Sequence, residues 1–420
     1  MTVIRPFQGV RPAKELASSI AALPYDVYNR EEAKEVVEQN PLSFLKIDRA
    51  ETQFPDDADM YSQSVYDRAR DTLDSMAADG SFIQDEAKCY YIYALTMDGH
   101  TQTGLVGCAS IDDYLENRIK KHENTREDKE LDRTRHVDTL SAQTGPIFLA
   151  YHAVPELNQI LDAVKMTLPL YDFTSEDSVR HQVWKIGSHD NIERIAHIFE
   201  EVDNIYIADG HHRAASAVKA GLKRRGEFPA YTGDEEFNYF LSVLFPAEEL
   251  HIYDYNRIVS DLNGYTFDAF LDMVRSGFEV SEPQTEAVRP SQKGEIGLYG
   301  NGFWYSLHAK PFLFSEDPVN GLDVSILQNV VLGPLLGIRD PKTDSRIRFV
   351  GGIRGLEALA EAVDDAGDGA AFAMYPTSMD ELLRVADAGK LMPPKSTWFE
   401  PKLRSGLLIH RFERSEHLTT

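Results

Sequence analysis

Apolar and polar positions alternate or recur along the chain in ways that mark its strands and helices. Residues 88–96 and 102–110 are rich in aromatic and β-branched side chains, as strands are. Asp98-Gly99 between them predicts a tight antiparallel hairpin. Residues 61–78 and 191–201 carry apolar side chains at helical spacing. The chain therefore combines antiparallel strands with amphipathic helices.

Other segments are assigned from shorter signals. Residues 30–39 are good helix formers, and Asn29 is the expected N-cap. The apolar run 44–47 predicts a strand, the charged stretch 116–138 is helix-permissive, and the apolar stretch 322–332 predicts a helix. Together these patterns predict an α/β (mixed α+β) fold.

The pattern changes at about residue 260, where a first α/β region gives way to helices and hairpins. At 420 residues the chain is long enough for two or three domains. We therefore expect a region 1–260 with α/β character and an α+β region over 261–420.

Residues 205–220 carry the strongest chemical signal. An apolar run ends in Asp209-Gly210, and His211, His212 and Arg213 follow at the start of a small-residue helix. A helix N-terminus presents free backbone N–H groups and a partial positive charge, which suits phosphate. The pattern indicates an anion-binding turn with an adjacent carboxylate. A capped helix with surface histidines is the structural alternative.

Net charge limits the partners. The chain carries 68 acidic and 43 basic residues, a formal charge of −25. Because nucleic-acid affinity comes largely from Lys and Arg, we expect no nucleic-acid partner. No apolar run approaches the ~18 residues of a membrane helix, and the N-terminus lacks a signal-peptide pattern. We therefore expect a cytoplasmic protein with no membrane contact.

Five separated motifs occur in order and carry a family resemblance. They are Leu23-Pro24-Tyr25-Asp26-Val27, Asn40-Pro41-Leu42-Ser43-Phe44-Leu45, Lys121-His122-Glu123-Asn124-Thr125, Asp209-Gly210-His211-His212-Arg213 and Pro393-Pro394-Lys395-Ser396-Thr397. Over nearly its whole length the chain resembles the domain-of-unknown-function 1015 family, whose members are sometimes labelled ParB-like. The Asp209 motif is similar to the signature of free serine kinases, in the superfamily that also contains ParB and sulfiredoxin.

The resemblance implies a ParB/sulfiredoxin-like nucleotide-binding core with additional N- and C-terminal α+β parts. It implies a kinase that uses ATP or ADP, with magnesium, to phosphorylate a small hydroxylated metabolite, with free L-serine the leading candidate. Phosphate binding is assigned to Gly210, His211, His212, Arg213, Lys121, His122, Thr125 and Arg133. A solvated helical face is the alternative for the charges of 116–138.

Two carboxylates are nominated for catalysis. Glu123 or Asp209 is expected to take the proton of the substrate hydroxyl, and the other to help hold magnesium. Asp26 is the next candidate for the base. Asp26, Lys395, Ser396 and Thr397 are assigned to substrate or site loops, with simple turns as the alternative reading.

Three rival functions remain open. A ParB-like nucleotide-binding regulator without metabolite turnover would carry a basic recognition helix, which the sequence does not show. Sulfiredoxin-like repair would need a cysteine where this chain has His211. A third reading gives the motif a structural role only. The sequence does not decide the phosphoryl donor or the oligomeric state.

Overall fold

The computed structural model describes residues 1–414. The chain forms two compact units. The first comprises Met1–Leu250 together with the residues from Pro401 onward, and the second comprises His251–Glu400. The division falls at 250/251, ten residues before the boundary expected at 260. The expected C-terminal region also omits the return of the chain to the first unit, which short-range patterns cannot reveal.

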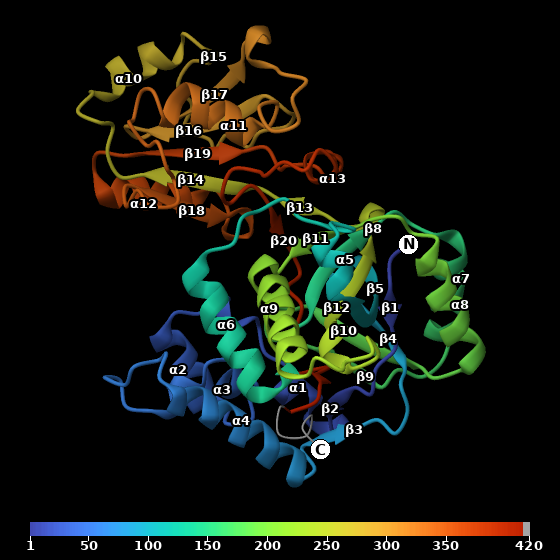
Figure 1. The fold of residues 1–420 in the computed structure, drawn as a ribbon. Coiled ribbons are helices and arrows are strands. Elements are labelled where there is room, and N and C mark those ends of the chain that lie inside the picture. The colour runs from blue at the N-terminus through green and yellow to red at the C-terminus, as the bar shows by residue number, and fades with distance from the viewer. Residues whose placement is uncertain (415–420) are drawn as a thin grey trace. The chain divides into compact units, whose positions relative to one another are not determined.

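The first unit is built on a mixed sheet with strand order β6-β11-β8-β12-β5-β4-β10-β9, and β1 pairs with β5 (Figure 1). The strands are β1 (Ile4–Arg5), β4 (Tyr90–Met97), β5 (His100–Ser110), β6 (Ile119–Lys120), β8 (Ile147–Tyr151), β9 (Tyr171–Thr174), β10 (Arg180–Ile186), β11 (Ile205–Asp209) and β12 (Tyr239–Pro246). The β11–β6 and β12–β8 pairs are parallel and the other pairs antiparallel. The predicted mixed α/β class is confirmed.

Helices and two small strand pairs complete this unit. The helices are α1 (Ala17–Ile20), α2 (Arg30–Gln39), α3 (Leu45–Asp48), α4 (Gln63–Ala78), α5 (Ile111–Leu115), α6 (Glu127–Leu140), α7 (Pro155–Lys165), α8 (His189–Glu200) and α9 (His211–Glu227). The small pairs join β2 (Val10–Pro12) to β3 (Phe82–Gln84) and β7 (Ala142–Gln143) to β21 (His410–Arg411). Through β21, the last described residues of the chain pack into the first unit.

Several local predictions are confirmed. The Asp98-Gly99 turn joins β4 to β5, with Met97 opposite His100, and both turn residues have positive φ, as a type I′ turn requires. Asn29 caps α2 in a reciprocal capping box with Glu32. Both features depend on side chains and dihedrals within a few residues of each other, so sequence alone is enough to specify them.

One local prediction is wrong. Residues 44–47 form no strand; α3 begins at Leu45, and its apolar side chains are buried in a helical core with Phe44 and Ile47. A short apolar run suits a buried helical turn as well as a strand, so periodicity cannot separate them. The charged stretch 116–138, described from its sequence as mostly helix-permissive, is helical from Glu127, where α6 begins, and β6 and a loop over residues 121–126 precede that helix.

Strand β11 and helix α9 share one hydrophobic core. It buries Ile205 and Ile207 of β11 with Ala214 and Val218 of α9, so the strand and the helix on either side of the Asp209 turn pack together. Helices α6 and α9 lie side by side (Figure 1), and Ser216 Oγ donates to the Glu130 carbonyl over 3.1 Å. The turn is therefore held between a buried strand and a packed helix.

The second unit contains an entirely antiparallel six-stranded sheet, in the order β15-β17-β16-β19-β14-β18. Its strands are β13 (Ile252–Tyr253), β14 (Tyr255–Val259), β15 (Phe278–Val280), β16 (Glu295–Gly300), β17 (Phe303–Ala309), β18 (Ile347–Gly351), β19 (Ala370–Met374) and β20 (Trp398–Phe399), and its helices are α10 (Phe267–Val274), α11 (Asp323–Leu327), α12 (Glu357–Ala366) and α13 (Met379–Asp387). The β13–β20 pair is separate. The helix expected over 322–332 starts as α11 and continues as a π-helical turn, Gln328–Leu332.

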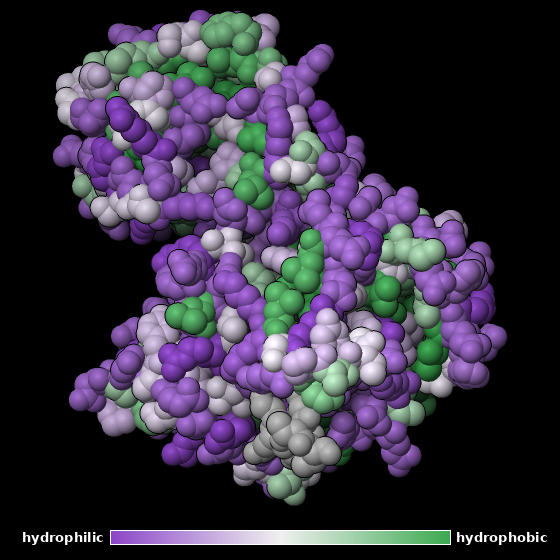
Figure 2. Space-filling model, in the orientation of Figure 1, coloured by the Kyte–Doolittle hydropathy of each residue, from purple (hydrophilic) through white to green (hydrophobic). Residues whose placement is uncertain are grey.

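The visible face of the protein is predominantly hydrophilic (Figure 2), in keeping with the net charge of −25. Within residues 1–414, no helix combines the length and the apolar character needed to cross a membrane.

Candidate functional site

The turn between β11 and α9 has a backbone that only glycine adopts readily. Gly210 has φ 94° and ψ 31°, and a Cβ placed there would lie 3.0 Å from Arg213 Nε. No side chain caps the start of α9. The backbone N–H groups of the first helical turn, which lack partners within the helix, are therefore the donors that an anion would meet.

Asp209 ends β11 and is surrounded by donors. Its Oδ1 accepts the Gly210 N–H over 2.9 Å, and its Oδ2 lies 3.3 Å from Lys402 Nζ and 3.9 Å from Arg213 Nη2. Burial raises the pKa of Asp209, but the Lys402 and Arg213 charges outweigh it and hold that pKa well below its usual range. The carboxylate stays ionised at neutral pH.

Lys402 is the site residue that the sequence analysis missed. It lies 193 positions after Asp209, and no motif marks it. It reaches the turn because the chain returns to the first unit at Pro401, where Ser405 forms a bridge with Ala22 and β21 pairs with β7. Only the tertiary structure could reveal this cation.

The loop over residues 121–126 lies at the same turn. Strand β6 runs parallel to β11, with Ile119 opposite Ile205, so the segments that follow the two strands emerge at the same end of the sheet. The Arg126 backbone N–H donates to His212 Nε2 over 3.0 Å. The structure thus brings Lys121 to Arg126 onto the start of α9, as a loop and not as part of a helix.

His122, Glu123 and His211 meet at this junction. One ligand atom from each, two imidazole nitrogens and a carboxylate oxygen, lies within 4.8 Å of the others. The two rings pack edge to face with centroids 4.5 Å apart. Glu123, the nominated second carboxylate, therefore lies beside the residue that begins α9.

Both histidines of this group are buried, with His122 2% and His211 6% exposed. Burial lowers the pKa of His122 to about 4, and burial together with the neighbouring His122 lowers the pKa of His211 well below its usual value. Both rings are therefore neutral at pH 7. The His122 ring also hydrogen-bonds the backbone of Ile207, which fixes its orientation against β11.

The remaining candidates already have partners within the protein. Lys121 Nζ lies 4.5 Å from the centre of the Tyr114 ring, and Thr125 donates to Glu130 of α6. Arg213 Nη1 donates to the Pro146 carbonyl over 2.8 Å, and its side chain is only 13% exposed. Arg213 therefore contacts both the backbone at Pro146 and the Asp209 turn.

Arg133 lies deeper, on α6. Its guanidinium donates to Asp132 over 2.9 Å and to the Asp48 carbonyl over 3.1 Å, and it stacks on Tyr25 at 4.2 Å. Tyr25, Arg133 and Arg213 line a common cavity of about 30 Å³, room for about one water molecule. Asp26, next to Tyr25 in a 3₁₀ turn, is exposed.

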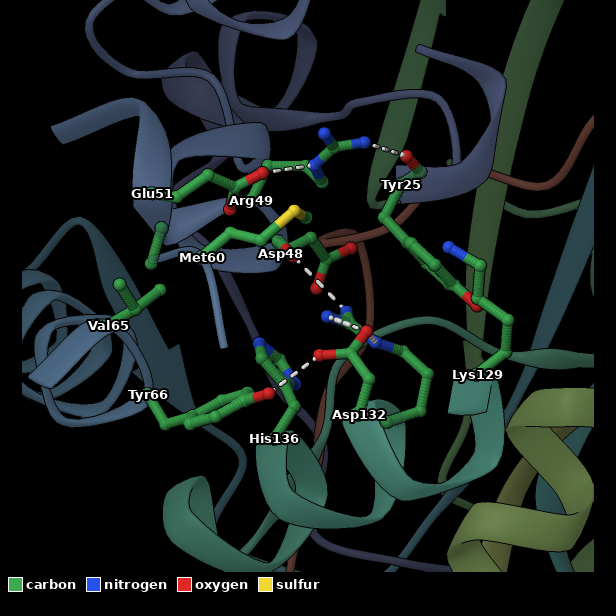
Figure 3. Close-up of a pocket in the computed structure, with 12 residues that line it drawn as sticks. Tyr25, Asp48, Arg49, Glu51, Met60, Val65, Tyr66, Lys129, Asp132 and His136 are labelled. Atoms are coloured by element: carbon green, nitrogen blue, oxygen red, sulfur yellow. Dashed lines mark hydrogen bonds and ion pairs between the residues drawn. The ribbon is translucent and has the colours of Figure 1, made fainter. Parts of the chain in front are cut away.

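A second cavity of about 30 Å³ adjoins the first (Figure 3). Several of its polar side chains pair with one another: Arg49 Nε lies 2.6 Å from Glu51 Oε1, and Tyr66 donates to Asp132 over 2.8 Å. Such internally satisfied polar groups stabilise the fold and leave little capacity for a ligand.

The loop carrying Lys395, Ser396 and Thr397 belongs to the second unit. Lys395 has φ 59°, and its carbonyl accepts from Arg257 Nη2 over 3.0 Å. Ser396 Oγ donates to the Pro393 carbonyl over 2.6 Å. These contacts hold the loop within its own unit, and its assignment as a site loop stays a prediction.

Comparisons with known proteins place this chain in a family. The chain belongs to the family described as "Protein of unknown function (DUF1015)", whose model matches residues 4–325. The predicted family is confirmed, whereas the wider relation to ParB and sulfiredoxin stays a prediction. A search of curated proteins found no match.

Solved structures show distant similarity. A free serine kinase variant in complex with AMP is 15% identical, with a TM-score of 0.37, covering 78% of this chain and 94% of its own. A conserved hypothetical protein from Pyrococcus furiosus is 16% identical, with a TM-score of 0.34 and coverages of 74% and 95%. C-terminally truncated SbnI from Staphylococcus aureus is 11% identical, with a TM-score of 0.36 and coverages of 74% and 83%. Similarity at this level assigns no function to this chain.

Proposed function

We propose that the protein is a nucleotide-dependent kinase that phosphorylates a small hydroxylated metabolite, free L-serine, to O-phosphoserine. The observation that carries the proposal is that two carboxylates each lie beside the start of one uncapped helix. The loop over residues 121–126 brings Glu123 beside His211, and Asp209 precedes the helix with Lys402 against it.

The start of α9 supplies the phosphate site. Its backbone N–H groups and the Arg213 guanidinium face the turn opened by Gly210. In-line phosphoryl transfer needs positioning and charge neutralisation more than covalent help from the protein. Arg213 and Lys402 provide positive charge around the turn, where the phosphates of ATP or ADP would lie.

The two carboxylates have different surroundings, and we assign them different roles. Asp209 is held ionised by two cations, so it is a weak base, but a loose transition state demands little base strength. We assign it to accept the hydroxyl proton. Its oxygens already face Gly210, Lys402 and Arg213 and suit magnesium poorly, so Glu123 is the carboxylate that we assign to a divalent ion.

The test is direct assay of the full chain. Purified protein is incubated with L-serine, Mg²⁺ and either ATP or ADP, and phosphoserine is measured by mass spectrometry. Phosphoserine formed with one donor supports the proposal and identifies the donor. Nucleotide consumption without phosphoserine would redirect the search to another hydroxylated metabolite. Tight nucleotide binding without any turnover would favour the ParB-like regulator instead.

A further inference from the structure

We propose that His122, Glu123 and His211 form a binding site for one divalent transition-metal ion of the Mn²⁺ or Zn²⁺ class. Two imidazoles and one carboxylate are a ligand set that such ions prefer, whereas Mg²⁺ favours oxygen ligands and water. The site is built from the loop after β6 and from the first residue of α9. Its existence rests on geometry; its use in phosphate binding rests on the proposed function.

The distances suit a metal after a small adjustment. The three ligand atoms lie within 4.8 Å of one another. Around an ion with bonds of ~2.1 Å, ligand atoms lie roughly 3.0–4.2 Å apart. The group therefore needs to close by roughly an ångström. The two imidazole rings already pack against each other, with centroids 4.5 Å apart.

A second observation comes from His211 itself. Its ring is 6% exposed, and Nε2 has no hydrogen-bond partner among the described residues. A buried polar atom of this kind costs free energy unless a ligand or water satisfies it. A metal ion bound between the two rings would satisfy it.

The neighbouring groups support the ligands. The His122 ring is held by its hydrogen bond to the backbone of Ile207, the arrangement that commonly orients metal-binding histidines. The Asp209 carboxylate interacts electrostatically with both rings, so it adds a second negative charge near the ligands. The nearby Lys121 ammonium group partly offsets that charge. Three protein ligands leave open positions on the ion, where water or phosphate oxygens can bind.

The experiment uses untagged full-length protein, stripped with a chelator and free of nucleotide and serine. Titration with Mn²⁺ should show one ion per chain, and pulsed EPR of the Mn²⁺ form should show coupling to two imidazole nitrogens. His122→Ala and His211→Ala should each weaken binding by at least about 100-fold and remove one coupling. His197→Ala is the control: it removes an exposed histidine of α8, which contributes no ligand to this group, and should leave Mn²⁺ affinity unchanged.

Absence of a bound ion, or of nitrogen coupling, in the wild-type protein would overturn the metal site, and so would unchanged affinity in His211→Ala. If a histidine variant fails to fold, the wild-type EPR spectrum alone decides. If the protein forms phosphoserine but binds no Mn²⁺, the metal-site proposal is wrong and the proposed function stands. If it binds Mn²⁺ through two nitrogens but forms no phosphoserine, the metal site stands and the proposed function is contradicted.

Discussion

Each unit places an aspartate at the start of a helix, and the two aspartates have opposite electrostatics. Asp209 precedes α9 and lies against Lys402 and Arg213, which hold its pKa well below the usual range. Asp323 begins α11, is 8% exposed and, among residues 1–414, accepts one hydrogen bond, from the Gly294 N–H over 2.9 Å. Burial raises the pKa of Asp323 to about 6, and the nearby Lys293 already pairs with Glu381.

The backbone conformations of the residues before the two helices also differ. Leu322, before α11, has an ordinary extended conformation, whereas Gly210, before α9, lies in the left-handed region. The first turn requires glycine, attracts two cations and leaves its carboxylate ionised. The second buries its carboxyl with one hydrogen bond. An aspartate at a helix start therefore indicates a site only when cations and an open backbone accompany it.

The largest expected difference between the two aspartates lies in turnover. Asp209→Asn keeps the shape and removes the charge, so phosphoserine formation should fall by more than about 100-fold while the protein stays folded. Asp323→Asn, the matched change in the second unit, should leave turnover unchanged. Glu123→Gln is expected to lose activity on the same scale. Equal activity of Asp209→Asn and wild type in the mass-spectrometric assay would contradict the assigned role.

The free energy of unfolding should also distinguish the two aspartates, this time through a change at Asp323. Because the folded-state pKa of Asp323 lies above the unfolded value of about 3.9, the folded state loses stability as pH rises from about 4 to 6. Asp323→Asn should therefore raise the free energy of unfolding at pH 7 by up to about 3 kcal/mol, and the gain should vanish near pH 4. Urea unfolding followed by tryptophan fluorescence at both pH values measures this. An equal gain in the free energy of unfolding at both pH values would show that ionisation of Asp323 is not the cause.

Arg213 tests the anion site at the first helix. Removing one charge-assisted hydrogen bond from a bound phosphate costs about 1.5–3 kcal/mol, so Arg213→Ala should weaken nucleotide binding roughly 10- to 150-fold. Because Arg213 also donates to the Pro146 carbonyl, some stability is lost as well. Arg213→Lys keeps the charge without the planar fork and should fall between Arg213→Ala and wild type. If calorimetric titration finds wild-type nucleotide affinity in Arg213→Ala, Arg213 does not bind the phosphates.

The smallest effect concerns the backbone of the turn. Gly210→Ala forces a left-handed residue and crowds Arg213 Nε, which should cost about 1–2 kcal/mol of stability. Gly226→Ala is the control in the same helix, since a Cβ there meets nothing within 4 Å, and it should be neutral or stabilising by up to about 1 kcal/mol. Thermal unfolding compares the two. Equal melting temperatures would mean that the turn tolerates a side chain.

Sequence reasoning reached the parts of the structure that local chemistry specifies. The Asp98-Gly99 hairpin, the Asn29 cap and the strand–turn–helix at Asp209 each depend on neighbouring residues. It was wrong at Leu45, where burial on all sides suits a helical turn as well as a strand. The composition of residues 116–126 is helix-permissive, but parallel pairing with β11 holds Ile119 and Lys120 as a strand, which composition does not reveal.

The candidate site divides in the same way. The motif at Asp209 stands out as a run of adjacent residues, but its contacts with Glu123 and His122 depend on the pairing of two distant strands. Lys402 carries no signal in the sequence, because its position follows from the return of the chain after a whole second unit. The chemistry of single residues is readable from sequence, whereas the neighbours that tune it are not.

That return of the chain has a consequence for biosynthesis. The second unit is inserted in the sequence between Asp209 and Lys402, which are 193 positions apart. At about 5–20 residues per second, a ribosome adds Lys402 roughly 10–40 s after Asp209. Throughout that interval the nascent first unit carries its aspartate without the lysine. The kinase centre that we propose is therefore completed only after the inserted unit has been made.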